Sequence, residues 1–334
     1  MSGEILRIEN LTTTADLPGR RVALVEQVAF SINRHCTTCL VGESGSGKSL
    51  TARAIMRLID PPLHVGHDAH ILLDGRDLMS LSEADMRRVR GADIAMIFQE
   101  PMSFLNPVYS VGDQVAETLV WHTGLSRRAA LDRTQELFRL VGIPSAERRI
   151  NQYPHELSGG MQQRVMIAMA LACEPKVLIA DEPTTALDVT IQAQILDLLR
   201  DLQQRLGMAI LLITHDLGVV AEMATDIVVM YGGAVVETGA TAQVLETPHH
   251  PYTEALLRSI PRLGMRRDQP LRVIPGLVPS PDQRGRGCRF APRCTHAFHA
   301  CTEPPPIFGS EHRAACWLLA EPTRTSERTQ EWSA

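Results

Sequence analysis

The chain has 334 residues, of which 44% are hydrophobic, and a formal net charge of −5; this suffices for one large domain or for a domain with an extension. The negative charge argues against a nucleic-acid-binding protein, no apolar run approaches the roughly 18 residues of a membrane span, and Met1 to Glu4 do not begin a secretory signal. We therefore expect a cytosolic protein whose seven cysteines are thiols or metal ligands rather than disulfides.

The first elements in chain order are two predicted strands. Ile5 to Glu9 and Val22 to Ile32 have the alternating or β-branched character of strands, and Thr12 to Arg21, which contains a proline and a glycine, is predicted to be a turn. Cys36 and Cys39 have the C-x-x-C spacing of redox and metal sites. We reject such a site here, because residues three apart on a strand face opposite ways.

A glycine-rich turn follows the short apolar run Cys39 to Val41 and precedes a helical pattern from Leu50 to Leu58. This context makes G-x-x-x-x-G-K-S a phosphate-binding loop, in which backbone N–H groups and a helix start face the anion. Lys48, one of only two lysines in the chain, can reach the terminal phosphates, and the Ser49 hydroxyl can bind Mg²⁺. The residues of this loop are Gly42, Glu43, Ser44, Gly45, Ser46, Gly47, Lys48 and Ser49.

Two further predicted strands end in polar residues. Ile94 to Phe98 is followed by Gln99, and Val177 to Ala180 is followed by Asp181 and Glu182. Ligands bind at the carboxyl ends of strands in α/β sheets. A carboxylate at the tip of a buried strand is costly unless it meets a cation, for which Mg²⁺ is the obvious candidate.

Between these strands, Met102 to Leu157 have a predominantly helical pattern, which we interpret as a helical insertion. Leu157 to Gln162 then form a second Ser/Gly turn that opens a helix to about Ala172, so this turn resembles a phosphate-binding helix start. The pattern continues as an α/β alternation. Its members are a helix from Thr190 to Leu206, a strand from Met208 to Thr214 that is followed by His215, a helix to Ala224, and a strand from Ile227 to Tyr231.

The composition changes after about Leu245. A short amphipathic helix is predicted from Glu254 to Ile260, and the chain beyond Pro261 is rich in proline, arginine and glycine. It contains four clustered cysteines, Cys288, Cys294, Cys301 and Cys316. Their spacings are not the C-x₂₋₄-C pairs usual for structural zinc, and four thiolates can equally hold an iron–sulfur cluster. From Pro322 the polar composition predicts a disordered tail.

In this order the motifs resemble those of the nucleotide-binding subunits of ATP-binding-cassette (ABC) transporters, over about Ile5 to Leu245. Gly42 to Ser49 resembles the Walker A loop, Gln99 the Q-loop glutamine and His215 the switch histidine. The other matches are Val177 to Asp181 with Walker B, Glu182 with its catalytic glutamate, Ser158, Gly159, Gly160 and Gln162 with the signature motif, and Ala186 to Asp188 with the D-loop.

The resemblance implies an α/β fold, the P-loop NTPase ABC cassette, which has a mixed sheet core, an antiparallel β part and a helical subdomain. The cassette is expected to cover residues 1–245, with its helical subdomain at about 102–172. A Cys-rich C-terminal extension then covers residues 246–321 and includes the module of four cysteines. The disordered tail covers residues 322–334.

The resemblance also implies roles for individual residues. The Walker A loop would hold the phosphates of ATP, while Ser49, Gln99 and Asp181 would hold Mg²⁺. Glu182 would act as the general base toward water, and His215 would contact the γ-phosphate. The signature residues and Asp188 would act in a head-to-tail pair, in which the signature of one chain covers the nucleotide of the other. The family's usual adenine-stacking aromatic is absent around Val22; Arg20 or Arg21 could stack in its place.

The chain from Thr247 onward resembles the ATPases of bacterial dipeptide, oligopeptide and nickel importers. This implies a 4Fe-4S cluster on the four cysteines, with zinc as the alternative, and a cargo of di- or oligopeptides, with nickel or another small solute as the alternative. The implied partners are a related second ATPase, two membrane-spanning permease subunits and an extracytoplasmic substrate-binding protein. The implied location is peripheral, on the cytoplasmic face of the bacterial inner membrane.

A soluble ABC ATPase that acts on DNA or ribosomes is the alternative from another class. The insertion Met102 to Leu157 is too short for the long coiled coils of the DNA-repair members, and the chain has no second Walker A motif of the kind that translation-type members carry. We therefore expect no nucleic-acid partner.

Overall fold

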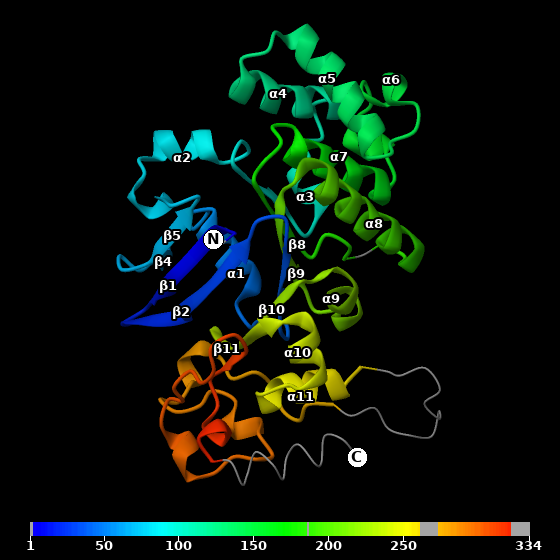
Figure 1. Cartoon of the computed structure of the whole chain (residues 1–334). Helices are drawn as coiled ribbons and strands as arrows, with labels where there is room; N and C mark the ends of the chain where they lie inside the picture. Colours follow the sequence, from blue (N-terminus) through cyan, green and yellow to red (C-terminus); the bar gives the residue numbers. More distant parts are fainter. Residues whose placement is uncertain (1–2, 186, 261–272, 322–334) are drawn as a thin grey trace. The chain divides into compact units, whose positions relative to one another are not determined.

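The computed structural model describes residues 3–185, 187–260 and 273–321 (Figure 1). The chain divides into two compact units. Unit 1 is formed by Met1–Arg7, Ser31–Thr37 and Ile71–Ile213, and unit 2 by Ile8–Phe30, Thr38–His70 and Thr214–Ala334. The predicted disordered tail and Ala186 of the D-loop match lie outside the described residues.

Unit 1 contains a parallel sheet built from β7 (Ile94–Ile97), β8 (Val177–Asp181) and β9 (Ala209–Thr214), in the order β7-β8-β9. Every residue of these strands is buried, which explains their nearly continuous apolar sequences. Ile97 pairs with Ala180, and Asp181 pairs with Ile213. The carboxyl ends of the strands therefore meet at one edge of the sheet, as the sequence predicts for Gln99, Asp181 and Glu182.

The helices of unit 1 confirm the predicted helical insertion. Ser110 and Ser126 cap α4 (Val111–Thr123) and α5 (Arg127–Leu140) by accepting backbone N–H bonds from Asp113 and Ala129. In Figure 1, α4 lies beside α5 and α7 (Gly159–Leu171). The remaining α-helices of unit 1 are α2 (Glu83–Val89), α3 (Pro101–Phe104), α6 (Ala146–Arg149) and α8 (Val189–Leu206). The strands β5 (His70–Leu73) and β6 (Arg76–Asp77) pair antiparallel.

The predicted turn from Thr12 to Arg21 is wrong for most of its length. The strand β1 (Glu4–Leu17) continues through it, and β2 (Arg20–Asn33) begins directly after a tight turn. The reason is that Leu11, Thr13 and Ala15 alternate as buried residues, so small and polar side chains continue the period of the strand. The neighbouring β4 (Leu63–Val65) pairs antiparallel with this part of β1.

Unit 2 contains β3 (Thr37–Val41), β10 (Asp226–Tyr231), β11 (Ala234–Ala240) and β12 (Arg313–Ala314), in the order β3-β10-β11-β12. The β3–β10 pair is parallel and the other two pairs are antiparallel, so the arrangement is mixed. The helices of this unit are α1 (Lys48–Ile55), α9 (Leu217–Met223), α10 (Thr241–Glu246) and α11 (Pro251–Arg258).

The segment of unit 2 that contains the four C-terminal cysteines, residues 281–320, is called the cysteine-containing segment and is built mainly from short 3₁₀ helices. They are Pro281–Gln283, Ala291–Arg293, His299–Thr302 and Trp317–Ala320. In the described part of the chain, every helix is too short or too polar to cross a membrane.

Candidate functional site

The glycine-rich loop joins the buried strand β3 to α1, and two of its residues must be glycine. Gly42 has φ 151°, and a Cβ atom there would lie 2.2 Å from the carbonyl oxygen of Met230. Gly47 has φ 102°, and a Cβ atom there would lie 2.9 Å from a methyl group of Val25. Both positions combine a left-handed backbone with a close approach, so a side chain at either one would distort the loop.

The Lys48 ammonium group lies inside the curve of this loop. It donates hydrogen bonds to the carbonyl oxygens of Gly42 (2.7 Å) and Glu43 (3.1 Å), and the residue is 6% exposed. The Ser46 hydroxyl is buried, and no hydrogen-bond partner for it lies among the described residues. A curled backbone, a cation and an unsatisfied hydroxyl are groups that a phosphate would engage. The loop therefore fits a nucleotide phosphate.

Gln99 and Glu182 meet in unit 1 at the carboxyl edge of its parallel sheet. The Gln99 amide donates a 3.1 Å hydrogen bond to the Glu182 carboxylate, and Thr185 Oγ1 donates a second one at 2.8 Å. The Glu182 backbone has φ 45°, and its N–H bonds the carbonyl oxygen of Ile213 at 3.0 Å. Both the backbone and the side chain of this glutamate are thus held in one position.

Asp181 is the last residue of β8 and is only 5% exposed. Burial of a carboxylate at this depth favours a cationic neighbour. Carboxylate, hydroxyl and amide oxygens are the ligands that Mg²⁺ takes from proteins. The donor types predicted for Mg²⁺, from Ser49 and Asp181 with Gln99, therefore suit the ion; Ser49 lies in unit 2 and the other two in unit 1.

The signature match lies at the start of α7 in unit 1. Ser158 caps this helix by accepting the N–H of Met161 at 3.4 Å, and both Ser158 and Gly159 are exposed. Gln162 is placed differently, since it is 4% exposed and its amide bonds the carbonyl oxygens of Pro154 (2.8 Å) and Leu157 (3.3 Å). Gln162 therefore holds the segment before the turn, while the exposed helix start remains available to a ligand.

Two further predicted residues lie at helix starts. Asp188 caps α8 by accepting the N–H of Ile191 at 3.0 Å. His215 is exposed in unit 2 between β9 and α9, whose cap is the neighbouring Asp216. Each unit thus carries part of the predicted set.

Sequence reasoning missed two residues that contact the glycine-rich loop. Arg293 pairs with the Glu43 carboxylate, and the Tyr252 hydroxyl accepts the Glu43 N–H. Both residues are buried. They follow Glu43 by 250 and 209 positions, and no local periodicity predicts contacts at such separations. The sequence signals were an arginine placed directly before Cys294 and a tyrosine within the Thr247 to Thr253 stretch.

The two arginines considered for adenine stacking are both paired with aspartates. Arg20 lies 3.2 Å from Asp282, and Arg21 lies 2.6 Å from Asp16. The hydrogen bond with Arg21 holds the pKa of Asp16 below its ordinary value. Stacking by either guanidinium would have to accommodate its ion pair.

The four C-terminal cysteines lie in one loop-rich segment. The Cys288 N–H donates to the carbonyl oxygen of Cys301 at 3.0 Å, and burial raises the pKa of Cys288. Among the described residues, the potential metal-ligand group with atoms within 4.8 Å of one another consists of Glu237, His249 and His312 and does not include the four cysteines. Thiolates are ligands of both zinc and iron–sulfur clusters.

The Glu237 carboxylate connects β11 by hydrogen bonds to two segments that follow it in the chain, one around His249 and one around His312. It accepts the N–H groups of His249 (2.5 Å) and His250 (3.0 Å) and lies 2.7 Å from His312 Nε2. Burial raises the pKa of Glu237, but hydrogen bonds from His312 and from the His249 N–H outweigh it, and the net shift is downward. Since its oxygens are already occupied by hydrogen bonds, this group is better explained as a buried polar network than as a metal site.

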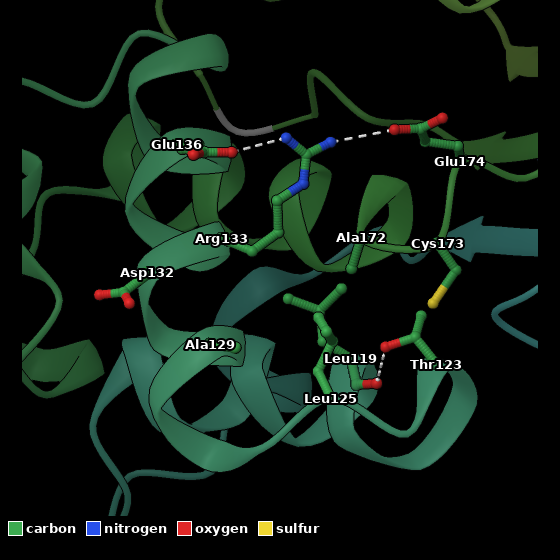
Figure 2. Close-up of a pocket in the computed structure, with 10 residues that line it drawn as sticks. All are labelled: Leu119, Thr123, Leu125, Ala129, Asp132, Arg133, Glu136, Ala172, Cys173 and Glu174. Atoms are coloured by element: carbon green, nitrogen blue, oxygen red, sulfur yellow. Dashed lines mark hydrogen bonds and ion pairs between the residues drawn. The ribbon is translucent and has the colours of Figure 1, made fainter.

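A separate hollow of about 490 Å³ in unit 1 is lined by residues of α4 and α5 and by those just after α7 (Figure 2). Arg133 pairs there with Glu136 at 2.7 Å and with Glu174 at 3.0 Å (Figure 2). Burial, and then the Glu174 charge, raises the pKa of Cys173. The cation is thus neutralised and the thiol stays protonated near neutral pH, so this hollow lacks the chemistry of a phosphate or nucleophile site.

Comparison with known proteins adds to this geometry. The ABC transporter family model matches residues 25–185, and that of the oligopeptide/dipeptide transporter C-terminal region matches residues 236–301. A putative peptide import ATP-binding protein of Brucella abortus is 52% identical over 93% of this chain and 96% of its own length. The oligopeptide transport ATP-binding protein OppD of Bacillus subtilis is 48% identical over 94% of this chain and 89% of its own length.

Solved structures resemble the chain as well. The ATP-binding cassette MJ0796, described as a dimer in a post-hydrolysis state bound to ADP and Pi, has a TM-score of 0.63 and 27% identity, over 71% of this chain and 98% of its own. CbiO1 of Clostridium perfringens, described as part of an ABC transporter complex, has a TM-score of 0.61 and 28% identity, over 73% and 92% of the two chains.

Proposed function

Because this chain belongs to the ATP-binding proteins of ABC transporters, which are ATPases, we propose that it is the motor subunit of a bacterial importer of di- or oligopeptides. Its mixed sheet and helices form an ABC ATPase cassette. The observation that carries the cargo assignment is the match of residues 236–301 to the oligopeptide/dipeptide transporter C-terminal region. The identity to peptide-import relatives over nearly the whole chain supports it.

In the proposed mechanism, the loop residues Gly42 to Ser49 bind the phosphates of ATP through their backbone N–H groups and the Lys48 ammonium. Ser49, Gln99 and Asp181 would hold Mg²⁺, which would supply positive charge that neutralises the phosphates. Glu182 accepts a proton from the attacking water. His215 contacts the γ-phosphate. The hydrogen bonds that fix the Glu182 carboxylate support its role, because a general base must be held within reach of its proton.

We propose that the signature turn is the surface that binds the partner ATPase. Ser158, Gly159 and Gly160 would cover the nucleotide held by a second cassette. Gln162 would hold the turn in place through its hydrogen bonds to the preceding segment, and Asp188 would lie in the same interface between the two cassettes. The exposure of Ser158 and Gly159 at the start of α7 supports this use. We propose a related second ATPase as the mate. ATP binding then closes the pair and hydrolysis releases it, which shifts the population between closed and open pairs.

We assign the membrane partners to a groove on unit 1. A hollow of about 850 Å³ there is lined by Phe104, Tyr109 and Trp121 together with polar residues of α4. Tyr109 is 57% exposed and Trp121 is 68% exposed. Large exposed aromatic residues beside a hollow are typical of a protein-binding surface. One of the two permease subunits would dock here and place the ATPase peripherally on the cytoplasmic face of the inner membrane, with a substrate-binding protein on the other side.

We further propose the domain boundaries of a cassette at residues 1–245, with its helical subdomain at about 102–172, and an extension at 246–321 with a module of four cysteines. Cys288, Cys294, Cys301 and Cys316 are the proposed ligands of a 4Fe-4S cluster, which would staple a segment built from short 3₁₀ helices. Anaerobic purification followed by iron and sulfide analysis tests this assignment. A colourless, iron-free protein that contains zinc would overturn it.

The importer assignment is tested in proteoliposomes that contain this ATPase, its mate, the two co-purified permease subunits and the binding protein. We expect ATP hydrolysis to rise when di- or oligopeptide is added, because cargo-loaded binding protein favours closure of the ATPase pair. The Glu182→Gln protein serves as the control without hydrolysis. Stimulation by nickel and not by peptide would reject the peptide cargo. Stimulation by DNA or ribosomes, with no response to membrane partners, would reject the importer.

A further inference from the structure

The second residue of the phosphate loop, Glu43, forms an ion pair with the cysteine-containing segment. Arg293, which ends the 3₁₀ helix Ala291–Arg293, donates one hydrogen bond to each carboxylate oxygen of Glu43, at 2.8 and 3.0 Å. The Arg293 side chain is 4% exposed and that of Glu43 is 29% exposed. A bidentate pair of this kind is stronger and more directional than a single charged contact, and low exposure reduces its screening.

Arg293 is itself fixed on its other sides. Its Nε donates to the carbonyl oxygen of Pro275 at 2.8 Å, and a terminal nitrogen donates to that of Ile274 at 3.3 Å. Its guanidinium carbon also lies 5.7 Å from the ring centre of Tyr231. Because the Nε atom and both terminal nitrogens of the guanidinium have hydrogen-bond partners, the pair holds Glu43 at a set position instead of moving with it.

The backbone of Glu43 has a second anchor. Its N–H donates a 2.8 Å hydrogen bond to the hydroxyl of Tyr252. Tyr252 is fully buried, and its ring lies 4.6 Å from that of Tyr231 and 5.3 Å from that of Phe290, measured between centres. A polar tip on a tightly packed aromatic ring is a rigid support.

The same residue shapes the phosphate-binding part of the loop. The Glu43 carbonyl oxygen accepts hydrogen bonds from the Lys48 ammonium at 3.1 Å and from the Ser46 N–H at 3.2 Å. The motif G-x-x-x-x-G-K-S leaves this position free, so phosphate chemistry does not require an acid there. The ion pair with Arg293 accounts for an acidic residue at this position. Because the Glu43 carbonyl oxygen bonds the Lys48 ammonium, a displacement of Glu43 would also displace Lys48.

We propose that Arg293 and Tyr252 are positioning residues that hold the phosphate loop, through Glu43, in the shape that receives the triphosphate. The inference rests on the proposed role of the loop. It gives the cysteine-containing segment a use in nucleotide binding that needs no redox chemistry, since this segment delivers Arg293. Without Arg293, the Glu43 carboxylate would be unpaired close to the phosphates, and it would both loosen the loop and repel the ligand.

A double-mutant cycle on the full chain tests the proposal, with KM for MgATP and kcat as separate readouts. We expect Arg293→Ala to raise KM about tenfold or more and to change kcat much less, since the damage is to positioning of the bound ligand. Glu43→Gln removes the repelling charge and should raise KM less. The double variant should be no worse than Arg293→Ala, and Arg293→Lys should restore part of the affinity.

The matched control is Arg139→Ala, which breaks an ion pair of 3.0 Å with Glu147 in unit 1. It should leave KM unchanged. Tyr252→Phe, which removes one hydroxyl, provides the answer if Arg293→Ala does not fold, and it should raise KM several-fold. Folded Arg293 and Tyr252 variants with the KM of the wild type, or strictly additive effects in the cycle, would overturn the inference. A wild-type protein that binds no ATP would instead overturn the proposed function.

Discussion

Glu182, the proposed general base, illustrates how neighbouring residues fix a single side chain. Its backbone has the left-handed φ of 45°, a conformation that costs a non-glycine residue free energy and persists only where neighbours enforce it. Here β9 accepts its N–H, while Gln99 and Thr185 donate to its carboxylate. The left-handed backbone and the three hydrogen bonds hold the backbone and the carboxylate of Glu182 in one position, as the proposed role of a general base requires.

The proposed role of Glu182 as general base predicts a specific kinetic result. Replacement by Gln retains the shape and the hydrogen-bonding capacity toward Thr185 but removes the basic oxygen. We therefore expect Glu182→Gln to bind ATP with nearly normal affinity and to hydrolyse it about 10² times more slowly or worse. Fluorescent-nucleotide titration and single-turnover hydrolysis in the purified complex measure the two quantities.

The control for this experiment is Glu136→Gln, which alters a carboxylate on α5 that is 59% exposed and pairs with Arg133. Its hydrolysis rate should remain that of the wild type. Near-normal turnover by Glu182→Gln in the assembled complex would show that another group accepts the proton.

At the scale of single residues, the sequence predicted the loop, Gln99, Asp181 and Glu182 because each stands directly after an apolar run that reads as a strand. The parallel register then brings such strand ends together. Arg293 could not be predicted in the same way. Its partner lies 250 residues away, and its 3₁₀ helix is too short to have a hydrophobic period.

At the scale of elements, the long periodic helices were predicted best. The helical pattern expected over Met102 to Leu157 is confirmed by α4 and α5, which lie within this range. The strand β11 (Ala234–Ala240) was missed because it contains glycine and a glutamate. That glutamate, Glu237, is 1% exposed, and its contacts with His249, His250 and His312 offset the free-energy cost of burying its carboxylate. A buried charge hides the apolar pattern from which strands are recognised.

The C-terminal elements depend on partners far away in the chain. The strand β12 consists of Arg313 and Ala314, which pair with Thr238 and Glu237 of β11. Two residues are too few for an alternation to be visible. The 3₁₀ helices around the cysteines are equally short. Their order comes from specific contacts such as those of Arg293, so composition predicted only a loop-rich extension.

At the scale of the whole molecule, the predicted nucleotide residues divide between the two units. The loop Gly42 to Ser49 and His215 belong to unit 2, while Gln99, Glu182 and the signature turn belong to unit 1. The exposed start of α7 carries a serine cap and two glycines, which are the groups that a helix start offers to an anion. In the proposed pair, this surface binds the nucleotide of the mate. A mutation in it should therefore weaken association of the two ATPases and leave nucleotide binding to the chain's own loop intact.

This separation can be tested with Ser158→Arg in the Glu182→Gln background, where bound ATP is retained. We expect nucleotide binding to the chain's own loop to persist, while ATP-dependent pairing with the mate, measured by light scattering, is lost, because a bulky side chain blocks the exposed helix start. Ser126→Arg is the matched control: Ser126 is also an exposed cap, on α5, so the loss of a cap costs each variant about 0.5–2 kcal/mol of stability. Since the two variants share this cost, only a surface role of Ser158 separates them. Pairing that survives Ser158→Arg, or that Ser126→Arg abolishes equally, would contradict the trans arrangement.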